Sequence, residues 1–293
     1  MSDEESKGPQ QSGASLCIYH GNCADGFTAA WVFSKHFPEA DFHAGFYQTD
    51  PPDCTGRRVV MMDFSYKRPV LLKMAEVARS IVIIDHHKSA EMDLVDLPKN
   101  VQTIFDMNRS GARMVWDFFD NEGDDPPLLV KHVEDRDLWR FNLKNTKAFQ
   151  ANLFSYEYTF ENWDKINQIC QDVNTYDQFI KEGEAITRKH DKDIRELISV
   201  AATREIICGY NVPVLNAPYF YSSEAGHIMA KNEPFAACYW QSKNEREYSL
   251  RSEEGGIDVS EVAKTFGGGG HKHAAGFRVN VGAASLSGHG AFR

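Results

Sequence analysis

Acidic residues and histidines gather at three places in the N-terminal part of the chain, each directly after a short apolar stretch. His20 and Asp25 lie in a glycine-containing segment, Asp63 follows the second stretch, and the run Asp85-His86-His87 follows the third. Carboxylates and imidazoles together suit Mn²⁺ and other divalent ions. Two such ions a few ångströms apart can activate a water molecule and stabilise the charge on a phosphoryl group. These residue types therefore predict a two-metal site for phosphoryl chemistry.

Each group on its own has an ordinary structural explanation. A single aspartate after a strand is more often a helix N-cap than a ligand, and a single histidine is usually a hydrogen-bonded core or surface residue. Several such groups at one sheet edge would repel one another and raise their pKa values unless a cation neutralised them. A fourth cluster at residues 134–137 offers Asp135 or Asp137 as a further ligand, whereas His132 just before it is not expected to be one. The combination favours a metal site.

The chain around these clusters alternates between strand and helix patterns. Short apolar strands are predicted at residues 16–19, 58–62 and 81–84, and helices at 28–37, 69–79 and 111–119. Nearly all-apolar strands that alternate with helices are typical of a parallel sheet covered on both faces. Open parallel sheets bind ligands beyond the carboxyl ends of their strands, which is where the first three clusters lie.

The second half of the chain has a different pattern of charged and apolar residues. Residues 160–202 are helical in pattern, and charges spaced three and four apart over 187–199 predict a solvated connecting helix. Short strands are expected at 205–210, 212–215, 235–239, 248–252 and 277–281, and a helix at 258–266 with Asp258 as its N-cap. The sequence therefore predicts an α/β fold in two domains, with a helical connector and a smaller C-terminal α/β domain.

Length, composition and charge limit the class of protein. The 293 residues suit two ordinary domains, and 42% hydrophobic with 25% charged residues is typical of a packed soluble chain. The net charge of −10 argues against a broad nucleic-acid-binding surface, though not against a local basic groove or a short ligand held by metal ions. The six cysteines form no Cys-x-x-Cys pair, which argues against a zinc ribbon or a redox dithiol. The apolar runs are of strand length, so a cytoplasmic location without membrane association is expected.

The Asp-His-His run at residues 85–87, placed after an apolar strand, resembles the motif that names the DHH phosphoesterase family. His20, Asp25, Asp63 and Asp137 follow the order of that family's other metal motifs. The resemblance implies that His20 and Asp25 bind metal, that Asp63 bridges two ions, and that His86 and Asp137 hold the second ion. It implies Mn²⁺ as the metal, with Mg²⁺ or Co²⁺ as alternatives.

The C-terminal part agrees independently. Leu-Arg-Ser at residues 250–252, the helix at 258–266 and the Gly-Gly-Gly-Gly-His run at 267–271 resemble the substrate-binding half of a DHHA1 domain. The resemblance spans residues 16–281. It implies a DHH catalytic domain at 16–186, a helical linker at 187–204 and a DHHA1 domain at 205–282. The polar, acidic composition of residues 1–15 predicts a disordered leader, and residues 283–293 form a tail.

The resemblance also implies roles for residues beyond the metal ligands. Asp85 would orient the neighbouring histidines, and His87 would face a phosphate oxygen or the leaving group, so Asp85, His86 and His87 form the implied catalytic set. The residues implied to hold the phosphate or terminal nucleotide of the substrate are Arg251, Ser252, Gly268, Gly269, Gly270 and His271. One departure stands out, because many family members carry Asp-x-Asp in the first motif where this chain has Cys23-Ala-Asp25. The number of first-motif ligands stays open.

The resemblance implies a phosphodiesterase that hydrolyses short or single-stranded nucleotide substrates, as nano-RNases and single-strand exonucleases do. Short oligoribonucleotides cut from one end in a 3′–5′ exonuclease-like manner are the leading substrate, followed by linear or cyclic dinucleotides. An exopolyphosphatase or pyrophosphatase is the second hypothesis, and a non-catalytic nucleotide-binding protein is the third. Single-stranded RNA or DNA, or a dinucleotide, is thus the expected binding partner. No obligate protein partner is expected, and a homodimer stays open.

Overall fold

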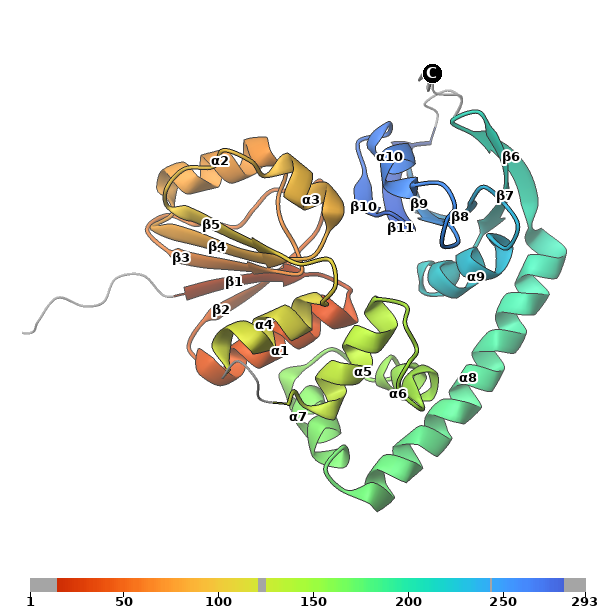
Figure 1. Ribbon diagram of the computed structural model, residues 1–293, viewed down its shortest axis with the longest axis horizontal. Coiled ribbons are helices and arrows are strands. Elements are labelled where there is room, and N and C mark those ends of the chain that lie inside the picture. The colour runs from red at the N-terminus through yellow and green to blue at the C-terminus, as the bar shows by residue number, and fades with distance from the viewer. Residues whose placement is uncertain (1–14, 121–124, 243, 282–293) are drawn as a thin grey trace, which may run out of the picture. The chain divides into compact units, whose positions relative to one another are not determined.

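The computed structural model describes residues 15–120, 125–242 and 244–281. The chain divides into two compact units, Met1–Ile186 and Thr187–Arg293, which are coloured red to green and green to blue (Figure 1). The leader expected at 1–15 lies outside the described residues except for Ser15, and the tail expected at 283–293 lies outside them entirely. Within the described ranges, no helix combines the length and the apolar character needed to cross a membrane.

The first unit contains a parallel sheet of five strands in the order β2-β1-β3-β4-β5. The strands are β1 (Ser15–His20), β2 (Asp41–Gly45), β3 (Arg58–Met62), β4 (Ser80–Asp85) and β5 (Val101–Phe105). Tyr19 pairs with Met62, and Met62 pairs with Ile84, so the carboxyl ends of the three central strands lie level. The predicted strands at 16–19, 58–62 and 81–84 are therefore confirmed, and they are the three central strands of the sheet.

Helices cover both faces of this sheet. Alternate residues of each strand face opposite sides, so Cys17 and Met62 pack with α1 (Ala24–His36) and α4 (Gly111–Phe119). Their neighbours Ile18 and Met61 pack on the other face with α2 (Arg68–Val77). Figure 1 shows α1 and α4 on one side of the sheet and α2 with α3 (Lys88–Asp93) on the other. The expected α/β architecture with helices on both faces is confirmed.

The first helix differs from its prediction at 28–37, because α1 begins four residues earlier at Ala24. Its first turn contains Gly26, where an added Cβ would lie 2.6 Å from the His20 carbonyl oxygen. Only glycine allows the helix to start this close to the end of β1. The consequence is that Asp25 lies in the first turn of a helix rather than in a loop.

A group of helices completes the first unit: α5 (Leu128–Asp137), α6 (Thr146–Leu153), α7 (Phe160–Ile169) and the start of α8 (Val173–Ala201). An added Cβ at Gly183 of α8 would lie 1.9 Å from the Ala148 carbonyl oxygen, so glycine sets the close approach of α8 to α6. The second half of α8 carries the Lys189–Asp193 ion pair at 2.5 Å, as expected for a solvated helix. The predicted linker at 187–204 thus contains the end of a helix that begins at Val173.

The second unit is built on a mixed sheet of six strands in the order β10-β11-β9-β8-β7-β6, in which only β7 and β8 run parallel. Its strands are β6 (Thr203–Ile207), β7 (Tyr210–Asn216), β8 (Ala236–Ser242), β9 (Glu245–Arg251), β10 (Gly269–His271) and β11 (Ala274–Asn280). The 3₁₀ turn η1 (Tyr219–Tyr221) and the helices α9 (Ser222–Met229) and α10 (Val259–Lys264) complete it. Asp258 caps α10 by accepting a hydrogen bond from the Ser260 amide.

One strand prediction in this unit is wrong. The strand expected at 205–210 is interrupted by a turn, because Cys208 and Gly209 both have positive φ angles of 48° and 84°. The turn joins β6 to β7 as an antiparallel hairpin. The apolar character of the segment concealed the turn, since Cys208 takes a left-handed conformation that side chains with a Cβ seldom adopt.

Candidate metal centre

Asp63 lies at the centre of the cluster that the carboxyl ends of β1, β3 and β4 bring together. Its Oδ1 is 3.0 Å from His86 Nε2, and its Oδ2 is 3.4 Å from His20 Nδ1. Its side chain is only 1% exposed, and its backbone has a positive φ angle of 54°. A conformation that L-residues seldom adopt at the end of a strand is a feature of functional sites.

Asp25 is held by the N-terminus of α4. Its Oδ2 accepts a hydrogen bond from the Gly111 amide at 2.6 Å, and its Oδ1 accepts one from the Ala112 amide at 3.0 Å. The same Oδ2 lies 3.7 Å from His86 Nε2, so the carboxylate faces the cluster as well as the helix. Helix N-termini stabilise negative charge through these free amides.

Gly111 is a residue of the site that the sequence interpretation missed. An added Cβ there would lie 2.5 Å from Asp63 Cβ and 2.9 Å from Asp25 Oδ2, closer than ordinary contact allows. Ser110, the N-cap of α4, is fully buried and accepts a hydrogen bond from the Arg113 amide. A Ser-Gly pair directly before a helix is a signal for an N-terminal anion contact, although it does not identify the anion.

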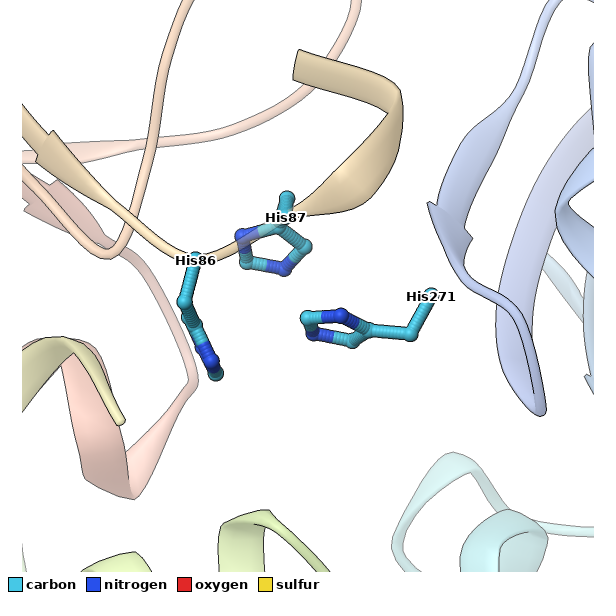
Figure 2. A group of neighbouring side chains, drawn as sticks. All are labelled: His86, His87 and His271. Atoms are coloured by element: carbon cyan, nitrogen blue, oxygen red, sulfur yellow. The ribbon is translucent and has the colours of Figure 1, made fainter. Parts of the chain in front are cut away.

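The Asp-His-His run places its three side chains in different roles. His86 and His87 follow β4 directly (Figure 2). Asp85 Oδ1 accepts hydrogen bonds from the backbone amides of His86 at 2.8 Å and His87 at 3.2 Å, and from His87 Nδ1 at 2.7 Å. Asp85 therefore fixes the ring of His87, while the ring of His86 faces the other aspartates.

The fourth cluster separates Asp135 from Asp137. Asp137 Oδ2 lies 3.5 Å from His86 Nε2, in the cluster. Asp135 instead accepts hydrogen bonds from the amides of Asn142 and Leu143 and from the Thr146 hydroxyl, at 2.8, 3.0 and 2.6 Å. Asp137 therefore lies with the candidate metal ligands, whereas Asp135 holds the loop that follows α5.

The crowding of acidic groups shifts their ionisation. Burial, with the charges of Asp63 and Asp137, raises the pKa of Asp25 well above its usual value. Burial also raises the pKa of Asp137. Burial opposes ionisation of Asp63 too, but its contacts with His20 and His86 outweigh that effect and hold its pKa well below the usual value. The pKa of His86 rises to about 10 despite burial, because these carboxylates surround it.

The donor set fits divalent metal ions. Among the described residues, Asp63 Oδ2 and His20 Nδ1 are buried and make no well-formed hydrogen bond, although they lie 3.4 Å apart as an ion pair. Buried polar atoms are usually completed by a hydrogen-bond partner or a ligand. Within the first unit, three sets of possible ligand atoms each lie within 4.8 Å of one another, and Asp63 belongs to all three. The sets are His20, Cys23 and Asp63; Asp25, Asp63 and His86; and Asp63, Asp85 and His87. A shared central carboxylate is the arrangement that a pair of bridged ions requires.

The second unit contains the residues predicted to bind substrate. Arg251 ends β9, and its guanidinium donates to the Leu250 carbonyl oxygen at 2.8 Å and to Ser223 Oγ at 3.3 Å. His271 ends β10 (Figure 2). Ser252 is only 2% exposed, and its hydroxyl donates to the Ile257 carbonyl oxygen at 2.7 Å. The Ser252 hydroxyl is therefore engaged within the loop after β9, and its contact with substrate stays a prediction.

The glycine run has a structural role within this unit. An added Cβ at Gly268 would lie 2.0 Å from the Gly276 carbonyl oxygen, and one at Gly270 would lie 2.6 Å from the Ala274 carbonyl oxygen. Gly270 also has a positive φ angle of 137°. These two glycines let β10 lie against β11, and Gly269 lies between them in β10.

Comparison with known proteins gives one sequence relative and several solved structures of low sequence identity. No family model matches the sequence. The chain is 28% identical over 286 residues to an uncharacterised protein of Acanthamoeba polyphaga mimivirus, covering 89% of this chain but only 66% of that relative. The pGpG-specific phosphodiesterase PggH of Vibrio cholerae matches with 15% identity and a TM-score of 0.47 over 92% of this chain and 94% of its own. The RecJ structure with Mn²⁺ from Thermus thermophilus also has 15% identity and a TM-score of 0.47, over 91% of this chain and 50% of its own.

Proposed function

We propose that the chain is a DHH–DHHA1 phosphoesterase, a metal-dependent phosphodiesterase that hydrolyses short or single-stranded nucleotide substrates. The observation that carries this proposal is the cluster at the carboxyl ends of β1, β3 and β4. There Asp63 lies within 3.0 Å of His86 and 3.4 Å of His20, and its Oδ2 has no hydrogen-bond partner among the described residues. A buried carboxylate between two imidazoles offers the oxygen and nitrogen donors that divalent ions bind.

The metal ligands in this proposal are His20, Asp25, Asp63, His86 and Asp137, with Asp63 shared between two ions. When bound, Mn²⁺ or a similar divalent ion would supply Lewis acidity toward a phosphoryl oxygen and an activated water. Asp25 contributes a carboxylate whose position is already fixed by the two amides of α4. Pre-positioned ligands bind metal without the loss of freedom that a mobile side chain would suffer.

His87 is the proposed proton donor to the leaving oxygen. Its Nδ1–H donates to Asp85 Oδ1 at 2.7 Å, which directs proton exchange with the substrate to Nε2. Burial alone would lower the pKa of His87, but the charge and hydrogen bond of Asp85 outweigh it and raise that pKa. The pair therefore keeps a proton available for a leaving alkoxide, as general acid catalysis requires.

In the second unit, Arg251 and His271 are the proposed contacts for a phosphate or terminal nucleotide of the substrate. The guanidinium of Arg251 is oriented by its bonds to Leu250 and Ser223, and an oriented guanidinium suits bidentate binding of phosphate. Short oligoribonucleotides are the leading substrate in this proposal, followed by linear or cyclic dinucleotides.

The test is a cleavage assay with Mn²⁺ and 5′-labelled RNA from dinucleotide length upward, with linear and cyclic dinucleotides, pyrophosphate and polyphosphate in parallel. Wild type should release mononucleotides only with metal present. Asp63→Asn should abolish release, whereas Asp53→Asn, a change at an exposed aspartate of the same unit, should leave it intact. Orthophosphate release from polyphosphate or pyrophosphate without RNA cleavage would contradict the nucleotide substrate. Nucleotide binding without any turnover would contradict the enzyme.

A further inference from the structure

Cys23 lies where its sulfur can contact the metal centre. It is the N-cap of α1, and its Sγ belongs with His20 and Asp63 to a set of ligand atoms that lie within 4.8 Å of one another. Sulfur and nitrogen ligands sit about 2.0–2.3 Å from a metal ion, so atoms that share one ion lie at most about 4.6 Å apart. The three side chains therefore have close to the spacing of a single coordination sphere.

The two partners of Cys23 in this set point to a ligand by themselves. Asp63 is 1% exposed, and its Oδ2 has no hydrogen-bond partner among the described residues. His20 Nδ1 is also buried without a well-formed hydrogen bond, and it lies 3.4 Å from Asp63 Oδ2. A carboxylate oxygen and an imidazole nitrogen that face each other without a well-formed hydrogen bond can both bind one cation, and the sulfur of Cys23 is the third donor beside them.

Other roles for this thiol do not fit the structure. Cys23 is a free cysteine, and its side chain makes no capping hydrogen bond to α1. Its Sγ instead lies within 4.8 Å of ligand atoms of His20 and Asp63. Cys17, by contrast, is fully buried in the core that packs with α1 and α4. A thiol placed beside an imidazole nitrogen and a carboxylate oxygen can act as a thiolate ligand of a divalent cation.

We propose that Cys23 is a sulfur ligand of one metal ion, so that His20, Cys23 and Asp63 form a mixed nitrogen, sulfur and oxygen site. The inference rests on the metal centre of the proposed function and adds a preference between ions. Thiolate favours softer ions such as Co²⁺, Zn²⁺ and Cd²⁺, whereas an all-oxygen and nitrogen site favours Mn²⁺ and Mg²⁺. The two ions of the centre would then differ in chemistry, one with a sulfur ligand and one bound by carboxylate and imidazole alone.

The test uses Co²⁺ as a spectroscopic probe of the full chain. Wild-type protein titrated with Co²⁺ should develop the near-ultraviolet absorption of sulfur-to-cobalt charge transfer, whatever its activity. Cys23→Ser and Cys23→Asp should lose this absorption, and Cys170→Ser, a matched change at a free cysteine of the same unit, should keep it. In competition calorimetry, Cys23→Asp should shift the ratio of Cd²⁺ to Mn²⁺ affinity toward Mn²⁺ by about tenfold or more.

The outcomes separate this inference from the proposed function. Calorimetric binding of Co²⁺ without the charge-transfer absorption would overturn the sulfur ligand and leave the metal-dependent phosphodiesterase standing. An absorption that persists in Cys23→Asp, with that variant folded by circular dichroism, would overturn it as well. Failure of wild type to bind Co²⁺, Cd²⁺ and Mn²⁺ would overturn the metal centre itself. Loss of the absorption in both Cys23 variants, with Mn²⁺ binding retained in Cys23→Asp, is the result expected.

Discussion

Acid should destabilise the first unit through His132, a fully packed histidine of α5. Its Nδ1 lies 2.9 Å from Thr146 Oγ1, its Nε2 lies 2.9 Å from the Tyr176 hydroxyl, and its ring stacks on Phe149 with centroids 4.4 Å apart. The Thr146 hydroxyl donates its one proton to Asp135, so it must accept from His132 Nδ1–H. The neutral ring therefore carries its proton on Nδ1, and its Nε2 accepts from the Tyr176 hydroxyl.

The size of the effect follows from the shift in ionisation. Burial lowers the pKa of His132 from 6.5 to about 4, against the opposing charge of Asp135. Above pH 6.5 neither the folded nor the unfolded chain binds this proton, so stability is unaffected. As the pH falls from 6.5 to 4 only the unfolded chain takes up the proton, so the folded state loses stability, and the loss is complete below pH 4. Linkage gives a loss of about 2 kcal/mol at pH 5 and about 3 kcal/mol at pH 4, relative to pH 7.

Urea unfolding of wild type and His132→Gln at pH 7, 6 and 5 measures this contribution. The glutamine variant starts from lower stability because it loses the ring stacking, but it has no proton to take up at this position. The stability difference between the two proteins should therefore shrink by about 2 kcal/mol from pH 7 to pH 5, while the titration of all other groups cancels. Phe149→Leu, which weakens the same packing but keeps the histidine, should retain the full pH dependence. Parallel profiles for wild type and His132→Gln would refute the reasoning.

Three further substitutions test the metal centre. Gly111→Ala should lower the free energy of unfolding by about 1–3 kcal/mol and weaken Mn²⁺ binding. The reason is that the new Cβ would lie 2.5 Å from Asp63 Cβ and 2.9 Å from Asp25 Oδ2. A raised urea midpoint would show instead that there is room for a Cβ. Asp137→Asn should raise the melting temperature of the metal-free chain by removing like charge, yet weaken Mn²⁺ binding at least about tenfold by calorimetry. Asp85→Asn should lower kcat about 10–100-fold with little change in Mn²⁺ affinity, and an equal fall in that affinity would make Asp85 a ligand instead.

The strands of the first unit show which part of the fold the sequence could predict. The three central strands are buried on both faces. Each therefore appears in the sequence as a continuous run of apolar residues, which is typical of a strand in a covered parallel sheet. The edge strands β2 and β5 are half exposed, with burial at only one end of β2, and their mixed sequences were not predicted as strands. Edge strands lack the second buried face that makes the signal continuous.

The candidate site shows the same division. The positions of His20, Asp63 and the Asp-His-His run follow from the rule that parallel strands end at one edge, so the sequence was sufficient to bring them together. The bonds from Gly111 and Ala112 to Asp25 join residues more than eighty positions apart. No local pattern encodes such a contact, which depends on how α4 packs against the sheet.

Asp135 and Asp137 differ in what their carboxylates contact: Asp135 binds the chain that follows α5, whereas Asp137 faces the candidate metal centre. They lie two residues apart on α5, so they point in different directions from the helix. Asp135 accepts three hydrogen bonds from the chain that follows α5, and its charge is fully used within the fold. Asp137 and Asp25 have raised pKa values, which means that the folded protein disfavours their negative charge in the absence of a cation. If these two carboxylates bind the divalent ion of the proposed function, that ion should restore their charge and stabilise the folded protein.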